Sequence, residues 1–445
     1  MQRRVRWAIA ALVGVSAVAV PHVSATASTR PARPATTTAA ATNGSRPVTL
    51  YVPIDENKAI YPIDTTTNVA GKKIPVKAEP ITVAISPDGL SAYVTTTRTD
   101  NVVPVDLTTN TAGARIELNS AFNIAIAPDG GRAYVTKGGG SSVAVVDLAS
   151  HFVVDNIKVG VGPYGIGITP NGAKAYVVNS SDQTVSPVDL ATDKAKTAIP
   201  VGPDPRGLAV APDGKTVYAV NTGDGTVTPI DTATDTAGPA FAVGEFAETM
   251  AITPDGKTGF VSHYDDALGG SVTPIDLATR TAGTPIAVPE PRQVVVTPDG
   301  KTVYADGWTT DTVTPIDVAT LTAKTPIPVG TGRFSFWMAI SPDQAPIAAF
   351  TATRTGDGPT WSFDASASIA PSSPIVKYRW RFGDGGLQTT HTPFVTHQYT
   401  SEGRFKVVLT ETDAAGTSTT QVFGGQTMLR NGGKSAHAVH FVTVH

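Results

Sequence analysis

The chain contains no cysteine, and this absence removes several classes of chemistry at once. Without thiols the protein can form no disulfide, use no thiolate nucleophile and offer no thiolate ligand to a metal. Charged residues are also scarce, at 16% of the 445 residues, and the formal net charge is −3. A weakly acidic chain is not built to attract a polyanion over its whole surface, so we expect no nucleic-acid partner.

Histidine is rare as well, with eight residues in the chain. Catalytic triads and multi-histidine metal sites both depend on imidazole, and the sequence has no phosphate-binding glycine loop and no nucleophile elbow. His263-Tyr264-Asp265-Asp266 is the one local cluster with ligand chemistry, and a solvated loop is the preferred interpretation over a metal site. We therefore predict no catalytic residue, no metal site and no cofactor.

No apolar run is long enough to anchor the chain in a membrane. Three arginines among the first six residues precede a short apolar run that ends at Val20, and the small-residue pattern Ala25-Thr26-Ala27 follows. These features are typical of a secretory signal, which we place at 1–27. The Thr-, Ala- and Pro-rich segment 28–46 is interpreted as a flexible leader. The expected location is extracellular, either released or held at the cell surface without a membrane anchor.

Turn-forming residues, in contrast, are abundant, with 42 Gly and 35 Pro. A Pro-Asp-Gly-like sequence recurs seven times at spacings of 41 to 44 residues, and an apolar step followed by Asp keeps the same period. A period near 42 residues with four short strands per unit predicts a β-propeller. The repeated prolines are Pro87, Pro128, Pro170, Pro212, Pro254, Pro298 and Pro342, and the repeated aspartates are Asp64, Asp106, Asp147, Asp189, Asp231, Asp276 and Asp317.

The two ends of the repeat region are complementary. The region begins with a second, third and fourth strand and ends with a first strand that has no successors. Pairing these ends closes the ring, removes two open sheet edges and predicts seven blades over 47–344. The expected strands at the two ends are Val48–Val52, Ala59–Ile63 and Lys73–Val76, and then Phe336–Ser341.

Each repeat carries three further structural predictions. The Asp that ends each third strand is expected to cap the following turn with its side chain and not to bind calcium. Most third strands contain a proline without a ladder donor, which predicts a bulge or an unpaired position there, as at Pro104, Pro187, Pro229, Pro274 and Pro315. A small residue is expected where the inner strands converge on the axis, at Ala84, Ala125, Gly167, Ala209, Ala251, Val295 and Ala339.

Two segments carry a family resemblance. AYVVNSSDQTVSPVDLATDKAKTAIPVG at 175–202 and TVYAVNTGDGTVTPIDTATDT at 216–236 resemble the YVTN-type β-propeller repeats of secreted and surface-layer-like microbial proteins. The resemblance covers about 48–344 and implies an extracellular propeller. The proline before the Ile-Asp or Val-Asp step departs from the usual pattern.

After Gln344 the 42-residue period stops. In YRWRF at 378–382, aromatic residues alternate with arginines, which predicts a half-buried strand, and several such runs suggest a β-sandwich. WRFGDG at 380–385 and HQYTSEGRFKVVLTETD at 397–413 resemble a PKD domain, an immunoglobulin-like module that implies a spacer or interaction role. We therefore predict an all-β chain, a seven-bladed β-propeller followed by a PKD-like β-sandwich over 345–445, with AVHFVTV in the tail as a final strand.

The loops that lead into each first strand form the candidate binding site at the mouth of the central channel. Their residues do not repeat, although the scaffold does, and they mix arginines, one glutamate and aromatic rings that could hold a polar or anionic ligand or a peptide. The alternative is that each residue plugs the axis or packs locally. The positions are Ile81, Phe122, Tyr164, Arg206, Glu248, Arg292 and Phe336, with Trp337, Gln293 and Asn123 adjacent.

We predict that Phe122, Tyr164, Arg206, Glu248, Arg292, Phe336 and Trp337 bind the ligand. Two function classes remain open. The first is a non-catalytic, monomeric binding protein whose partner is an extracellular protein, a cell-wall component or a carbohydrate, with the PKD domain as spacer or adhesion module. The second is a propeller hydrolase of lactonase type, in which the arginines and Glu248 would act on a small molecule or glycan.

Overall fold

The computed structural model describes residues 46–97, 99–264, 269–330, 337–424 and 427–445. The predicted signal and all of the predicted leader except Arg46 lie outside these residues. Regular structure within them is almost entirely β, with one short 3-10 turn at Lys434–Ala436. No helix in the described ranges has the length and hydrophobicity that a membrane span requires.

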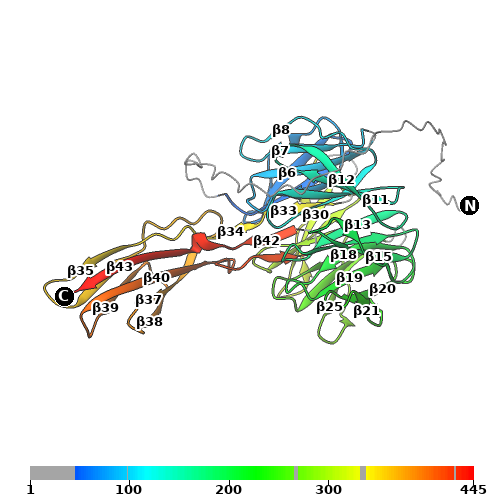
Figure 1. Cartoon of the computed structure of the whole chain (residues 1–445). Coiled ribbons are helices and arrows are strands. Elements are labelled where there is room, and N and C mark those ends of the chain that lie inside the picture. Colours follow the sequence, from blue (N-terminus) through cyan, green and yellow to red (C-terminus); the bar gives the residue numbers. More distant parts are fainter. Residues whose placement is uncertain (1–45, 98, 265–268, 331–336, 425–426) are drawn as a thin grey trace, which may run out of the picture. The chain divides into compact units, whose positions relative to one another are not determined.

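Seven antiparallel sheets within the described residues form the blades of a propeller, which confirms the predicted fold (Figure 1). From the innermost strand outward, their strands are β33(Ala339–Ile340), β1(Thr49–Ile54), β2(Ala59–Asp64), β3(Val69–Ala70) and β4(Ile74–Pro75); β5(Glu79–Ile85), β6(Ser91–Thr97), β7(Val102–Asp106) and β8(Thr111–Ala112); β9(Ala121–Ile126), β10(Arg132–Lys137), β11(Ser142–Asp147) and β12(Phe152–Lys158); β13(Pro163–Ile168), β14(Lys174–Asn179), β15(Thr184–Asp189), β16(Lys194–Ala195) and β17(Ile199–Pro200); β18(Pro205–Val210), β19(Thr216–Asn221), β20(Thr226–Asp231), β21(Thr236–Ala237) and β22(Phe241–Ala242); β23(Ala247–Ile252), β24(Thr258–His263), β25(Ser271–Asp276), β26(Thr281–Ala282) and β27(Ile286–Ala287); β28(Val294–Val296), β29(Thr302–Gly307), β30(Thr312–Asp317), β31(Thr322–Ala323) and β32(Ile327–Pro328).

The ring closes through one blade that draws on both ends of the repeat region. β33 pairs antiparallel with β1, so that Leu50 lies opposite Ile340. Trp337 adds a link to the next blade, because its N–H donates to the carbonyl of Ile81 at 3.1 Å and its carbonyl accepts the N–H of Val83 at 3.0 Å. This seam confirms the predicted closure and leaves neither end of the ring as an open edge.

The first six Pro-Asp-Gly-like sequences form turns, whereas the seventh does not. Each of the six has a glycine with φ between 67° and 73°, and the Asp or Asn side chain accepts a backbone N–H two residues later. At Pro342-Asp343-Gln344 the prediction of a turn is wrong, because Asp343 and Gln344 form strand β34. Gln344 stands where the turn needs glycine, and the second strand of that blade is already supplied by β1.

The small inner residues face aromatic rings. Each small residue lies directly opposite a ring on the second strand, so a larger side chain would compete with that ring for the same space. Ala84, for example, lies opposite Tyr93. The other pairs are Ala125 with Tyr134, Gly167 with Tyr176, Ala209 with Tyr218, Ala251 with Phe260, Val295 with Tyr304 and Ala339 with Tyr51.

The prolines of the third strands interrupt the fourth strands. The carbonyl of Pro187 accepts the N–H of Lys196 at 2.8 Å, but proline has no N–H to return, and the outer strand breaks into β16 and β17. In β11 the equivalent residue is Val145, and its partner β12 is continuous over seven residues. Both blades shift register by one residue, so proline removes the pairing beside it without causing the bulge. The predicted irregularity is confirmed.

The aspartates that end the third strands cap turns, as predicted. Asp231 Oδ1 accepts the N–H groups of Ala233 and Thr234 at 2.9 Å each. These bonds and that of the Thr234 hydroxyl lower the pKa of Asp231. Equivalent bonds are made by Asp64, Asp106, Asp147, Asp189, Asp276 and Asp317.

Polar side chains also bond neighbouring blades to one another. The hydroxyl of Tyr176 donates to Asp235 Oδ1 at 2.6 Å, and Lys174 Nζ lies 2.8 Å from the same carboxylate. Burial raises the pKa of Asp235, but hydrogen bonds from Lys174, Tyr176 and Lys196 outweigh it and leave that pKa lowered. Tyr304 makes the same kind of bond to Asn68 at 2.6 Å.

The C-terminal region forms three further sheets, and two of them enclose a separate apolar core. Trp380 and Phe363 are buried at its centre, while Arg379 and Arg381 face outward, as the alternation predicts. The expected final strand in the tail is confirmed, because β43 pairs with β40 over eight residues. The sheets are β35(Thr351–Arg354), β36(Thr360–Asp364) and β39(Phe394–Gln398); β38(Leu387–Thr390), β37(Ile375–Arg381), β40(Gly403–Asp413) and β43(His437–Val444); and β34(Asp343–Gln344), β42(Thr427–Asn431) and β41(Val422–Gly424).

Candidate functional site

Three aromatic residues of the predicted mouth come together. The ring centroids of Phe122 and Tyr164 lie 4.6 Å apart, and Trp337 lies 5.4 Å from the first and 5.3 Å from the second. Edge-to-face and tilted contacts of this kind stabilise a rigid aromatic cluster. Trp337 is 3% exposed, whereas Phe122 and Tyr164 are half-buried and reach the surface. The buried Trp337 therefore packs against both of the more exposed rings.

Charged residues form the other part of the mouth. Arg206 donates from Nη1 to Glu248 Oε1 at 2.9 Å and from Nη2 to Asp204 Oδ2 at 3.0 Å. Glu248 is 7% exposed. Burial raises its pKa, and the nearby charges of Arg206 and Arg292 oppose that rise. Burial also raises the pKa of Tyr164, with Glu248 adding to the effect, so the charged and aromatic parts share one electrostatic environment.

The guanidinium of Arg292 lies over two aromatic rings. Its guanidinium carbon lies 4.1 Å from the ring centroid of Tyr264 and 4.0 Å from that of Trp308. A guanidinium that lies over two aromatic rings loses much of its conformational freedom. Beneath it, Asp306 Oδ1 accepts the backbone N–H groups of Arg292 and Gln293 at 2.8 and 2.6 Å. Asp306 has no exposed surface, and burial raises its pKa to about 7.

Neighbouring blades fix the backbone of these residues. The hydroxyl of Thr95 donates to the carbonyl of Phe122 at 2.7 Å, that of Thr136 to the carbonyl of Tyr164 at 3.1 Å, and that of Ser262 to the carbonyl of Arg292 at 2.9 Å. At Glu248 the contact is a close approach instead. A Cβ on Gly207 would lie 2.5 Å from the Glu248 carbonyl oxygen, so the site requires glycine there.

The remaining predicted positions have local roles. Ile81 and Asn123 are buried, and the Asn123 side chain accepts the N–H of Ile124. The Gln293 amide bonds both the N–H and the carbonyl of Met338 and so ties the closing strand to the neighbouring blade. Phe336 lies outside the described residues. The alternative of local packing thus holds for some positions, while the aromatic and charged residues gather as a group.

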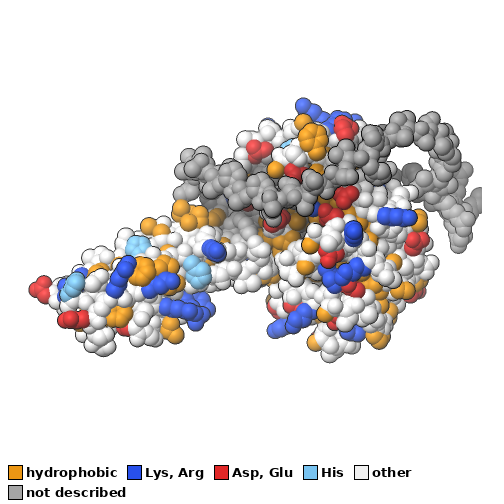
Figure 2. All heavy atoms as spheres, viewed as in Figure 1, with side chains coloured by type: hydrophobic (Ala, Val, Ile, Leu, Met, Phe, Trp, Pro, Cys, Tyr) orange, Lys and Arg blue, Asp and Glu red, His pale blue; other side chains and the backbone are white. Residues whose placement is uncertain are grey.

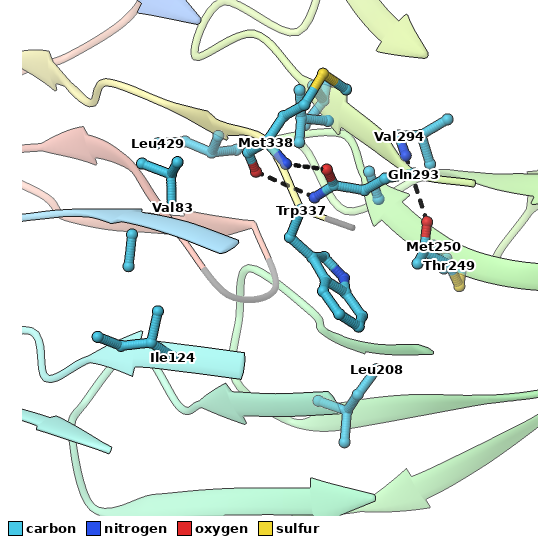
Figure 3. Close-up of a pocket in the computed structure, with 14 residues that line it drawn as sticks. Val83, Ile124, Leu208, Thr249, Met250, Gln293, Val294, Trp337, Met338 and Leu429 are labelled. Atoms are coloured by element: carbon cyan, nitrogen blue, oxygen red, sulfur yellow. Dashed lines mark hydrogen bonds between the residues drawn. The ribbon is translucent and has the colours of Figure 1, made fainter. Parts of the chain in front are cut away.

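The channel below the mouth is filled. Figure 3 shows Trp337 and Met338 among inner-strand residues, with Leu429 from β42 lining the same space. The enclosed volume is about 30 Å³, which is room for about one or two water molecules. The channel therefore has no room for a ligand larger than water.

Sequence reasoning missed several residues of the site. Asp204, Tyr264, Asp306 and Trp308 all contact the predicted set. The available signal was the carboxyl of Asp306 at a position where the other repeats have Thr, Ser, Val or Pro. His263 corrects an expectation, because it is buried in β24 with Nδ1 2.8 Å from the Glu245 carbonyl and not part of a solvated loop.

The metal interpretation of that cluster gains no support from the described residues. Burial lowers the pKa of His263, and Asp265 and Asp266 lie outside the described ranges. Among the residues that the structure describes, no group of three His, Asp or Glu side chains could hold a metal ion.

Comparison with known proteins identifies the C-terminal module. Residues 343–424 match the family model of the PKD domain. A microbial collagenase from Vibrio alginolyticus is 42% identical over 77 residues, which are 17% of this chain and 9% of that protein. The chain thus spans less than a tenth of that relative. A PKD domain and this relative together suggest an extracellular protein.

Solved structures share the propeller fold. Hydrazine synthase from Kuenenia stuttgartiensis superposes with a TM-score of 0.53 at 21% identity, over 70% of this chain and 95% of that one. A putative 6-phosphogluconolactonase from Bacteroides uniformis gives 0.56 at 14% identity over 66% and 99%. One from Bacteroides fragilis gives 0.56 at 16% over 66% and 97%. At these identities the likeness shows the fold alone.

Proposed function

We propose that the protein is a secreted, non-catalytic binding protein. Its propeller mouth captures an extracellular ligand, and its PKD domain acts as a spacer or adhesion module at or near the cell surface. The observation that carries the proposal is the convergence of Phe122 and Tyr164 with Arg206, Glu248 and Arg292 at one end of the first strands. The YVTN resemblance, which implies a secreted or surface protein, agrees with it.

The chemistry of the mouth narrows the ligand class. The two arginines are balanced by Glu248 and Asp204, so the site has no large excess of either charge. Half-buried rings offer flat apolar faces, and fixed charged groups offer directional hydrogen bonds. A polar ligand with an apolar face, such as a peptide or a carbohydrate, fits this combination better than a highly charged polymer.

A ligand screen with a matched pair of variants tests the proposal. Peptide and oligosaccharide fragments are screened by thermal shift, because a ligand at 100 times its Kd stabilises the native state by about 2.7 kcal/mol. The triple variant Arg206→Ala, Glu248→Ala, Arg292→Ala should lose the shift. The control Lys215→Ala, Asp213→Ala, Lys301→Ala removes the same charges from turns at the other end of the first strands and should keep it. A shift that survives in the first triple variant would contradict the proposal.

A second candidate is a hydrolase of lactonase type. It is favoured by Glu248, a buried carboxyl with a raised pKa beside two arginines, and by putative lactonases among the structural neighbours. A carboxyl of this kind can serve as a general acid or base. Turnover of a lactone panel that falls at least about 100-fold in Glu248→Gln would favour this candidate, whereas no turnover by the native chain would reject it.

A further inference from the structure

The outer face of the β38–β37–β40–β43 sheet carries five cations. Lys377, Arg379 and Arg381 alternate on β37 with buried Tyr378 and Trp380, and all three are exposed. The cross-strand registers place outward residues of the neighbouring strands on the same face. Those residues include two further cations and three apolar side chains, namely Arg404, Lys406, Leu387, Val439 and Phe441.

No carboxylate balances these charges on the sheet. The acidic residues of its four strands are Glu411 and Asp413, and both are buried on the inner face. In the described part of the chain, none of the five cations forms a salt bridge. Arg404 instead lies 4.3 Å from the ring centroid of Phe441. The face is thus strongly basic on a chain whose net charge is −3.

Large apolar side chains flank the cations on both sides. Leu387 is 64% exposed on β38, and Phe441 and Val439 are 55% and 45% exposed on β43. Figure 2 shows Lys and Arg side chains beside hydrophobic ones on the module that Figure 1 labels β35 to β43. Like charges on adjacent strands repel one another and do not stabilise the fold. Exposed apolar side chains that gather in one patch mark interaction sites. Their combination on one sheet face indicates an interaction surface.

The spacing of the cations indicates the form of the partner. Residues two apart on a strand are separated by about 7 Å, so β37 presents a straight row of three positive charges at that interval. A linear polymer with one negative charge per unit matches such a row. The flanking apolar side chains require that the polymer also has apolar faces, which the C–H faces of sugar rings provide and a simple phosphodiester chain does not.

We propose that this face binds an acidic polysaccharide through its carboxylates and ring faces. Lys377, Arg379 and Arg381 pair with successive carboxylates, with Arg supplying a two-pronged hydrogen-bonding group. Phe441 and Val439 contact the sugar rings. The inference rests on the proposed function only in assigning the PKD domain an adhesive role, and it is independent of any ligand at the propeller mouth.

The experiment measures binding of polygalacturonate to the full chain by calorimetry at low and high salt. The variant Lys377→Gln, Arg379→Gln, Arg381→Gln should bind about 10- to 100-fold more weakly, since each exposed ionic contact contributes about 0.2–1 kcal/mol and multivalent contacts reinforce one another. The control Lys194→Gln, Lys215→Gln, Lys301→Gln makes the same change in net charge on the propeller and should bind within about twofold of the native chain. Equal weakening by both variants, or no binding by the native chain, would overturn the proposal.

Other probes separate the remaining partners. Polyphosphate and vesicles of anionic lipid supply negative charge without sugar rings, and dextran supplies rings without charge. Tighter binding of polyphosphate or of the vesicles than of polygalacturonate would reject a polysaccharide. The mouth variant Arg206→Ala, Glu248→Ala, Arg292→Ala should bind polygalacturonate as the native chain does. A failed ligand screen at the mouth would therefore not count against polysaccharide binding by the PKD sheet. A failure to bind polygalacturonate would likewise not count against a ligand at the mouth.

Discussion

The propeller and the PKD domain use the same antiparallel sheets but place their charges differently. In the propeller, cations such as Arg132 and Lys174 bond carboxylates of the next blade at 2.6 and 2.8 Å. On the outer PKD sheet, exposed cations such as Arg379 form no salt bridge with any residue that the structure describes. In one region polar side chains join parts of the fold, and in the other they are available to a partner. Substitutions of these interblade residues should therefore change stability, while substitutions of the exposed PKD cations should change binding to a polysaccharide.

The largest expected effect is on the aromatic cluster of the propeller. Trp337→Ala removes a 3% exposed ring that contacts Phe122 and Tyr164 and should lower the free energy of unfolding by about 3–5 kcal/mol. The matched change on the PKD domain, Phe394→Ala, removes a ring that is 56% exposed and should cost less than about 0.5 kcal/mol. Urea unfolding measures both. A small loss of unfolding free energy in Trp337→Ala would show that the seam does not stabilise the closed propeller.

The next effect concerns Asp306 and depends on pH. Its pKa is raised to about 7 in the folded state, against about 3.9 in the unfolded chain. Because the folded state holds the proton more tightly, the stabilisation is complete below about pH 4 and is lost as the pH rises toward 7. The reference is Asp306→Thr, which has the hydroxyl that Thr95 and Thr136 supply in other blades. Relative to this variant, the free energy of unfolding of the native chain should fall by up to roughly 4 kcal/mol over that pH range.

Unfolding curves of the two proteins at pH 4.5, 6 and 7.5 measure this difference. Several other carboxyls also titrate, such as Glu411 with a pKa of about 7, but they are common to both proteins and cancel. A difference that stays constant across the three pH values would contradict the assignment of Asp306 as a carboxyl that is protonated in the folded state up to near neutral pH.

A smaller effect is expected between blades. Tyr176→Phe removes the hydroxyl that donates to Asp235 at 2.6 Å and should cost about 1–2 kcal/mol. Tyr93→Phe is the control. The ring of Tyr93 meets His151 edge-on at a centroid distance of 6.3 Å, and phenylalanine keeps this ring contact. The control substitution should therefore cost less than about 0.5 kcal/mol. Equal costs for the two changes would show that the hydroxyl bond to the next blade contributes nothing.

The repeat period was enough to predict the blades, the closing strand and the capping aspartates, because turn chemistry acts locally and recurs in every unit. The seventh turn was mispredicted because Pro342-Asp343 keeps the motif while Gln344 lacks the glycine that the turn requires. The mouth could be predicted only as a set of positions. Which of them face solvent depends on neighbours such as Tyr264 and Trp308, which come from other loops and follow no repeat.

The basic face of the PKD sheet could be predicted in part from the sequence. The alternation in YRWRF places Arg379 and Arg381 on one side of a strand, and the structure confirms this. The contribution of Lys406 and Phe441 depends on the pairing of β40 with β43, which lie about thirty residues apart. Their register cannot be obtained from local patterns, since a shift of one residue would turn every side chain to the other face.

One paired measurement tests the difference between the two regions most directly. Two variants with the same change in net charge are compared for both melting temperature and polygalacturonate affinity. The first is Arg132→Gln, Lys174→Gln, Lys196→Gln in the propeller, and the second is Lys377→Gln, Arg379→Gln, Arg381→Gln on the outer PKD sheet. The propeller variant should melt several degrees lower with unchanged affinity, and the PKD variant should lose affinity with an unchanged melting temperature. A PKD variant that melts lower, or a propeller variant that loses affinity, would contradict the separation of roles.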